Sequence, residues 1–132
     1  MILLLDTHVA VWLTVEPDRL SRPADSAIRR ARSTGGLAIS SLTLWEAAFL
    51  VRRGSIRTAV SPEQFLREML ENAHLIVKDL TATIAALATE FPDDYPKDPL
   101  DRIIGATARA ENLPLVTRDE KIRASSLIKT IW

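Results

Sequence analysis

The sequence predicts an α/β fold in which a mainly parallel sheet carries helices on both faces. Short continuous apolar runs recur along the chain, as expected of strands that are buried on both sides. Segments with apolar residues at helical spacing lie between these runs, and this alternation implies right-handed crossovers. The 132 residues contain no repeat, low-complexity tract or linker, so we expect one domain, 1–132.

Five short apolar runs are expected to form the strands. The first run, Ile2 to Leu5, ends at the polar residue Asp6. The other four contain Leu37-Ala38-Ile39, Leu75-Ile76-Val77, Leu115-Val116 and the stretch from Leu127-Ile128 to Ile131. Runs this short and this apolar are typical of the interior of a parallel sheet.

Three helices have recognisable starts or stops. Ser61 is expected to cap a helix that has Pro62 at its first position and Gln64 as a capping-box residue. Asp98-Pro99 opens another helix with a single apolar stripe. The segment from Leu42 to Arg53 has apolar residues at helical spacing and precedes a glycine, which commonly follows the end of a helix.

The composition limits the possible functions. The absence of cysteine excludes disulfides, thiolate metal sites and cysteine nucleophiles. Lys plus Arg and Asp plus Glu both number 17, so a polyanion must find a local basic patch or a bound cation. The chain shows no signal peptide and no run approaching the ~20 apolar residues of a membrane span, so we expect a soluble cytoplasmic protein with no membrane association.

Four acidic residues are expected to meet at one edge of the sheet. Asp6 and Asp119 follow strands, while Glu46 and Asp101 lie in the first turns of helices, and ligands of open parallel sheets bind at the carboxyl ends of the strands. Carboxylates brought together repel one another unless a positive charge lies among them. Mg²⁺ or Mn²⁺ suits such an all-oxygen site, whereas zinc usually recruits Cys or His, and only His8 is near.

Each acid also has a structural interpretation. Glu46 could complete a capping box with Thr43. Asp98 and Asp119 are plausible N-caps, and Asp101 is favourable near any helix N-terminus. Asp6 ends a strand that is buried on both faces, where a carboxylate has little structural role, so the structural interpretation is weakest for this residue. The convergence of all four at one edge favours the metal site.

Several motifs together resemble one family. They are Leu4-Leu5-Asp6-Thr7-His8, the Trp45-Glu46 helix, the run from Asp98 to Ile104, the run from Leu115 to Asp119, and the closing Thr130-Ile131-Trp132. In order and spacing, essentially the whole chain resembles a PIN-domain ribonuclease of the VapC toxin type. The resemblance implies a PIN-like three-layer fold with strand order 3-2-1-4-5, Mg²⁺ or Mn²⁺, and endonuclease activity on RNA.

The resemblance also implies roles for individual residues. The catalytic, metal-binding quartet falls on Asp6, Glu46, Asp101 and Asp119. Thr117 matches a hydroxyl position near the metal, and Asp98 is an additional acid that some relatives use. Asp98 and Asp101 lie on the same helical turn, so either could be the closer ligand, with Asp101 ranked first. Lys97 stands where many relatives have histidine.

Basic and aromatic residues are candidates to contact the substrate. Arg102, Arg118, Arg52 and Lys97 could bind RNA phosphates, and the alternative for each is a solvated surface charge. Trp12, Trp45 and Trp132 could stack on bases, but Trp12 and Trp45 repeat at helical spacing with other apolar residues and are expected in the core or an interface. His8 is expected to pack in the first turn of a helix.

The resemblance further implies two protein partners, a cognate antitoxin that inserts a basic side chain into the acidic pocket and a second copy in a homodimer. Two other functions are alternatives. Phosphatases that form an aspartyl-phosphate need a second Asp two residues after the first, where this chain has His8. A catalytically silent module that binds metal together with RNA or protein is the remaining alternative.

Overall fold

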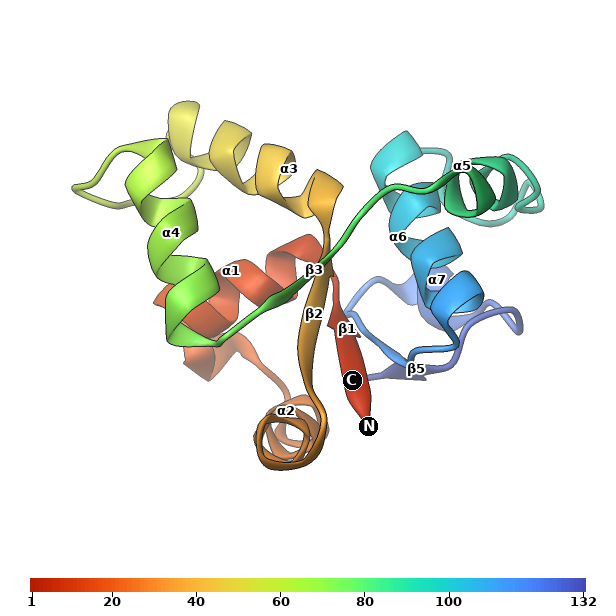
Figure 1. The fold of residues 1–132 in the computed structure, drawn as a ribbon, viewed down its shortest axis with the longest axis horizontal. Coiled ribbons are helices and arrows are strands. Elements are labelled where there is room, and N and C mark those ends of the chain that lie inside the picture. Colours follow the sequence, from red (N-terminus) through yellow and green to blue (C-terminus); the bar gives the residue numbers. More distant parts are fainter.

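A computed structural model describes residues 1–132, and its five strands form one parallel sheet (Figure 1). The strand order is β3-β2-β1-β4-β5, as the family resemblance implied. Every pair of neighbours is parallel. The strands are β1 (Ile2–Leu5), β2 (Gly36–Ser40), β3 (Ile76–Lys78), β4 (Leu115–Val116) and β5 (Thr130–Ile131). The first strand therefore lies at the centre, with its carboxyl end close to those of β2 and β4.

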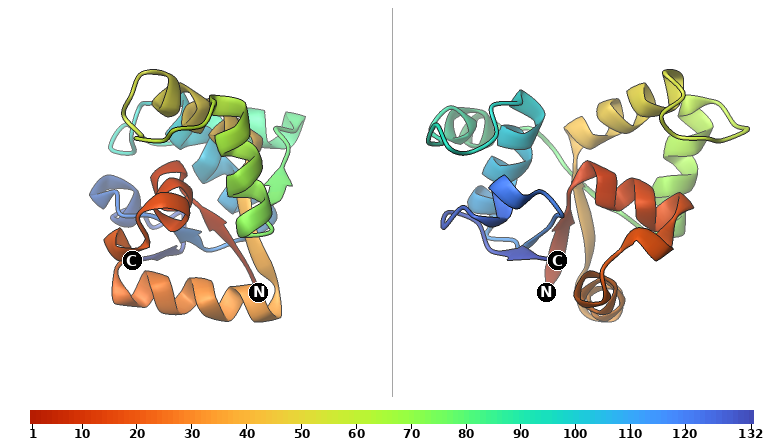
Figure 2. Two further views of the ribbon diagram at one scale, coloured as in Figure 1. Left: turned by 90° about the vertical axis from the view of Figure 1, so that its left-hand side faces the viewer. Right: turned by 180° about the vertical axis from the view of Figure 1, so that it is seen from behind.

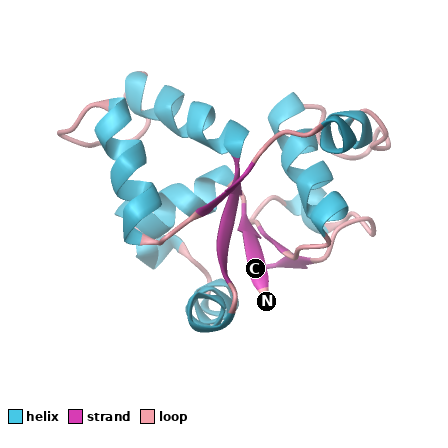
Figure 3. Cartoon of the chain, viewed as in Figure 1, coloured by secondary structure: helices cyan, strands magenta, loops and turns pink.

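Helices connect the strands (Figure 3). They are α1 (Thr7–Val15), α2 (Arg22–Thr34), α3 (Ser41–Arg52), α4 (Pro62–Asn72), α5 (Ala82–Ala88), α6 (Pro99–Glu111) and α7 (Glu120–Arg123), with a short 3-10 turn η1 (Pro17–Arg19). None of these helices is long and apolar enough to cross a membrane.

The two faces of the sheet bury separate apolar cores. Leu3 and Leu5 of β1 pack with α1, α2, α3 and α4, whereas Leu4 points to the opposite face and packs with α5, α6 and α7. This alternation follows from the two-residue period of a strand. Figure 2 shows the two groups of helices on opposite sides of the strands. The predicted arrangement, a sheet covered on both faces, is confirmed.

Most sequence-predicted elements are present, with local differences. The helix expected over 42–53 runs from Ser41 to Arg52, and the last expected strand shrinks to two residues. Ser61 caps α4 through its hydroxyl, as predicted, but the Gln64 side chain contacts Glu68 rather than closing a capping box. Two helices, α2 and α5, lacked any sequence-based prediction.

Candidate metal centre

A pocket of about 410 Å³ opens at the carboxyl ends of the central strands. Its lining residues come from the ends of β1 and β4 and from α1, α3 and α6, and Figure 1 shows α3 and α6 on either side of the strands. All five predicted metal-site acids line it. The lining residues are Asp6, His8, Val9, Trp12, Glu46, Asp98, Asp101, Arg118 and Asp119. Four stretches of sequence therefore contribute carboxylates to one hollow.

Asp6 is held in place by the strand end and by a buried threonine. Its Oδ1 accepts a hydrogen bond from the backbone N–H of Thr7 at 2.8 Å, so Asp6 also caps α1. The expectation that this carboxylate has little structural role was therefore wrong. Thr117, which is fully buried, donates its hydroxyl to Asp6 Oδ2 at 2.7 Å. The same hydroxyl oxygen accepts the backbone N–H of Asp119 at 3.1 Å, which ties the two acids together.

Glu46 is positioned by contacts one turn earlier in α3. Ser40, not Thr43, caps this helix, so the structural alternative for Glu46, a capping box with Thr43, is wrong. The Thr43 hydroxyl is buried and lies 3.0 Å from that of Thr7. This hydroxyl pair joins the beginnings of α1 and α3. The Glu46 carboxylate faces the pocket and has no hydrogen-bond or ion-pair partner within the protein.

The two acids of α6 differ in their contacts. Asp98 is exposed, and its Oδ1 accepts the backbone N–H of Leu100 at 2.8 Å, as predicted for an N-cap. The Asp101 carboxylate is more buried and accepts no intramolecular hydrogen bond. Asp101 therefore has both carboxylate oxygens available for a ligand. Asp119, which precedes α7, resembles Asp98 in that it caps its helix, accepting from the backbone N–H groups of Lys121 and Ile122.

A buried tyrosine fixes the first turn of α6. Tyr95 is 2% exposed and donates its hydroxyl to the backbone carbonyl of Asp101 at 3.0 Å. The phenol rests against Gly105, where an added Cβ would collide with the Tyr95 hydroxyl and lie 2.9 Å from Phe91. Sequence reasoning missed Tyr95, because nothing in the pattern indicates that a loop tyrosine folds back onto the helix.

Arg102 anchors the same loop. Its guanidinium donates to the backbone carbonyls of Phe91, Pro92, Tyr95 and Pro96 at 2.9 to 3.4 Å. These bonds occupy its donors inside the protein, and Arg102 does not line the pocket. The geometry therefore contradicts the expectation that Arg102 binds RNA phosphates and gives it a structural role.

The pocket is strongly acidic, and its carboxylates have no ion-pair partner within the protein. Burial, followed by the charges of Asp6, Asp98, Asp119 and Glu46, raises the pKa of Asp101 to about 7. Burial also raises the pKa of Asp6, although the hydrogen bond from Thr117 opposes this change. No Lys or Arg forms an ion pair with any of the five acids. Charge of this sign, gathered without a partner, is what a bound cation neutralises.

The arrangement suits a hydrated ion. No three carboxylate or imidazole groups are placed to hold one ion directly. Mg²⁺ normally keeps several of its waters and binds through one or two carboxylates, so a ring of acids with room for water fits it. All donors facing the pocket from the acids are oxygens, which agrees with a hard divalent ion.

The remaining predicted residues divide into two groups. Arg118 and Trp12 line the pocket, as does His8, which is exposed at the start of α1. Lys97 and Arg52 lie outside the pocket.

Two of the predicted tryptophans differ in their exposure. Trp12 is 8% exposed and contacts Trp132, as expected of a core residue. Trp45 is 59% exposed, so its predicted place in the core is wrong, although its stacking on Phe49 leaves the predicted interface role open.

The parallel sheet, its strand order β3-β2-β1-β4-β5 and the acidic pocket at its carboxyl edge are the features expected of a PIN-like fold. Comparison with protein families gives the same fold. Residues 3–126 match the family model described as "PIN domain", and the chain therefore belongs to the PIN-domain family. Ribonuclease VapC22 of Mycobacterium tuberculosis is 37% identical over 131 residues, which cover 98% of this chain and 97% of that protein. PIN-domain ribonucleases of the VapC type generally depend on a divalent metal.

Solved structures share the fold at lower identity. VapBC2 from Rickettsia felis, bound to a DNA fragment from its promoter, superposes with a TM-score of 0.76 at 21% identity, covering 98% of this chain and 97% of that chain. A toxin–antitoxin complex from Klebsiella pneumoniae has a TM-score of 0.65 at 21% identity, covering 96% and 94%. These likenesses extend over nearly the whole chain and support the topology described above.

Proposed function

We propose that this chain, acting as a single PIN domain, is a divalent-metal-dependent endoribonuclease and the toxin of a VapBC-type toxin–antitoxin pair. One observation carries the proposal: five carboxylates line one pocket and none has a cationic partner. The 37% identity with Ribonuclease VapC22 supports the RNA substrate and the hydrolysis of phosphodiester bonds.

Asp6, Glu46, Asp101 and Asp119 are the residues that would hold Mg²⁺ or Mn²⁺, with Asp98 at the exposed rim. When bound, such an ion lowers the pKa of a water molecule and neutralises charge on the phosphate. The protein's own contribution is orientation. Thr117 fixes the Asp6 carboxylate through a 2.7 Å hydrogen bond and connects it to the backbone of Asp119.

Arg118 is the cationic side chain at the rim of the pocket. Its guanidinium lies 5.8 Å from the centre of the Trp12 ring, and it makes no hydrogen bond within the protein. A guanidinium with free donors suits a phosphate oxygen of the substrate. We assign Arg118 to substrate binding on these grounds, with Thr117 acting indirectly through Asp6.

The proposed partners are RNA, a cognate antitoxin and a second copy of the chain, and the proposed place of action is the cytoplasm. Solved relatives of the same fold include a toxin–antitoxin complex, which supports the antitoxin. An acidic pocket whose carboxylates form no ion pair within the protein is also suited to receive an Arg or Lys side chain from a protein inhibitor.

The test is cleavage of structured RNA by purified protein freed of any partner. We expect cleavage with Mg²⁺ or Mn²⁺ and none in EDTA, and we expect Asp6→Asn to abolish it while the exposed control Asp18→Asn retains it. Cleavage without metal, or full activity in Asp6→Asn, contradicts the proposal. If RNA binds but no product forms with either metal, the chain is the catalytically silent module instead.

A further inference from the structure

A second, smaller groove adjoins the acidic pocket. It encloses about 250 Å³ between α1, η1 and the end of α3. His8 and Trp12 line both hollows, so the two share a wall. The family motifs contain none of the charged residues that distinguish this groove, which are Glu16, Arg19 and Arg53.

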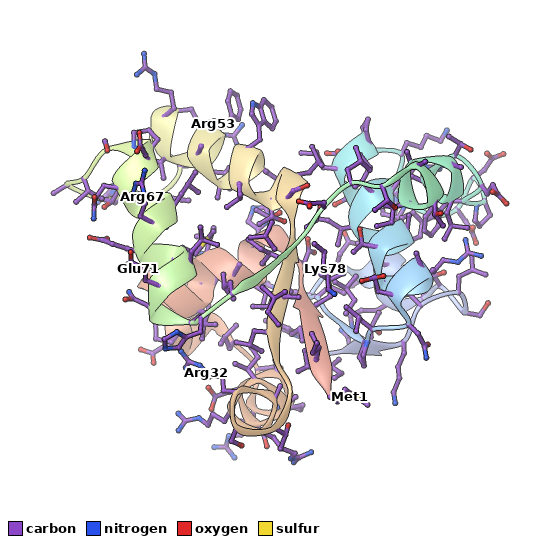
Figure 4. The ribbon with its side chains drawn as sticks, in the orientation of Figure 1. Met1, Arg32, Arg53, Arg67, Glu71 and Lys78 are labelled. Carbon is purple, nitrogen blue, oxygen red and sulfur yellow. The ribbon has the colours of Figure 1, made fainter.

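The groove is basic where the pocket is acidic. The guanidinium of Arg19 lies over the Trp12 ring, 4.6 Å from its centre, and Arg118 approaches the same ring from the acidic pocket. Arg53, at the end of α3 (Figure 4), lies 5.3 Å from the centre of the Phe49 ring. Each of the three guanidiniums therefore lies over an aromatic ring, and the Trp12 ring is shared by Arg19 of the groove and Arg118 of the pocket.

These guanidiniums keep most of their donors free. Arg19 has only a 3.9 Å contact with Glu16, between side chains that are about half exposed, and such pairs contribute little. Arg53 uses its Nε to donate to Ser55, and its terminal nitrogens make no hydrogen bond within the protein. Stacking on a ring leaves the edge of a guanidinium available for phosphate oxygens.

We propose that this groove binds the RNA strand next to the phosphate that is cut, with Arg19 and Arg53 contacting backbone phosphates. This inference rests on the proposed function. A chain with no net charge, whose pocket is acidic, needs a local source of attraction for a polyanion. RNA is favoured over a protein partner because the free groups in the groove are guanidinium edges suited to phosphate, and only one carboxylate lies among them. Trp12 is too buried to stack on a base and serves as the support for Arg19 and Arg118.

The test measures binding of a short fluorescein-labelled single-stranded RNA of mixed sequence by anisotropy, in EDTA and over a range of salt concentrations. Arg19→Gln and Arg53→Gln should weaken binding, and the slope of log affinity against log salt should fall by about 0.7 for each arginine removed. Arg19→Lys should keep the slope, because it retains the charge. The control is Arg29→Gln, which removes an equally positive surface charge from α2.

Glu16→Gln provides an independent variant that adds no strain to the groove. Removing its only carboxylate should tighten RNA binding. If wild type cleaves RNA but none of these variants changes affinity or slope, the groove inference fails while the proposed function stands. If wild type neither binds nor cleaves RNA, the proposed function fails. If Arg19→Gln and Arg53→Gln keep RNA affinity but lose a partner protein encoded beside this chain, the groove is a protein-docking site and the inference is overturned.

Discussion

The two ends of the same sheet carry opposite chemistry. Five acids line the pocket at the carboxyl end, whereas the hollow of about 340 Å³ at the amino end contains Arg109 and Lys129 and no carboxylate. Met1, labelled in Figure 4, marks this second hollow. The strands are shared, so the difference must come from the residues and helix ends that meet at each edge.

Helix direction explains part of the difference. In right-handed crossovers, helices begin at the carboxyl ends of strands, and α1, α6 and α7 are each capped there by an aspartate. Helix N-termini carry partial positive charge and stabilise carboxylates, while C-termini favour cations. The dipoles make the acidic edge tolerable, but the raised pKa of Asp101 shows that they do not neutralise it.

The largest expected effect separates Asp101 from the other acid on its helical turn. Asp101→Asn should reduce RNA cleavage by more than about 100-fold, since loss of a mere hydrogen-bond partner of a metal ligand already costs about 10- to 100-fold. Asp98→Asn should cost much less, because Asn is an equally good N-cap and the side chain is exposed. The measurement is the initial rate at saturating Mg²⁺.

Lys129→Gln is the matched variant at the amino end, where an exposed charge is removed far from the acids. Its cleavage rate should equal that of wild type. Equal losses of cleavage rate in Lys129→Gln and Asp101→Asn would show that the two ends of the sheet do not differ in function. A larger loss in Asp98→Asn than in Asp101→Asn would show that the ranking of the two acids is wrong.

The next effect concerns the hydroxyl that orients Asp6. Thr117→Val preserves the shape of the side chain but removes the hydrogen bonds to Asp6 and to the Asp119 backbone. Metal affinity or activity should fall by about 10- to 100-fold. Titrating Mn²⁺ into the cleavage assay checks this, and Thr117→Ser should recover much of the loss. An unchanged metal requirement in Thr117→Val would remove its orienting role.

A smaller effect should appear as a pH dependence of stability. The pKa of Asp101 is raised in the folded state, so its protonated form contributes stability that is full below about pH 4 and is lost as pH rises through about 7. After allowance for solvent screening, this is on the order of 1 kcal/mol, or a few degrees in Tm. Thermal melts in EDTA between pH 5 and 8 measure it.

Metal should reverse that trend, because it binds the deprotonated acids. Added Mg²⁺ should raise the Tm more at pH 8 than at pH 5, and Asp101→Asn should melt at a higher temperature than wild type in EDTA at pH 8. A Tm that rises with pH in EDTA would contradict the assignment of an uncompensated acidic pocket.

The smallest effect is expected at Tyr95. Tyr95→Phe keeps the buried ring but removes the hydroxyl, and with it the hydrogen bond to the Asp101 carbonyl and the atom that lies nearest Gly105. The loss in unfolding free energy should be about 1 kcal/mol, with a modest fall in cleavage rate. Urea unfolding measures the first quantity. Gly105→Ala should lower the unfolding free energy by more, about 1 to 3 kcal/mol in total, because the added methyl group forces the Tyr95 phenol to move.

Much of this edge of the protein was predictable from the sequence. Short buried strands, proline at the first position of α6 and the polar residues that follow each strand identify where the acids must meet. The acids that double as caps, Asp98 and Asp119, were recognisable for the same reason: a cap is a local signal. Parallel alignment then brings local signals to one place.

The contacts that depend on tertiary folding were not predictable. In the sequence Arg102 resembles a surface cation, yet the loop between α5 and α6, which includes Phe91 eleven residues earlier, folds over it and supplies carbonyl acceptors. Trp45 has helical spacing but faces outward, since the periodicity of α3 does not determine which side meets the core. The helix α2 has a capping serine, Ser21, followed by a proline two residues later, and this signal could have revealed it.

The most direct test of a cation held by the acidic edge is calorimetric titration of Mn²⁺ into the RNA-free protein at pH 8. Wild type and Lys129→Gln should bind Mn²⁺ alike, while Asp6→Asn and Asp119→Asn should each lose most of the affinity. Both aspartates line the same pocket, so removing either should be felt by the same ion. Equal Mn²⁺ affinity in wild type and in both aspartate variants would contradict the central claim.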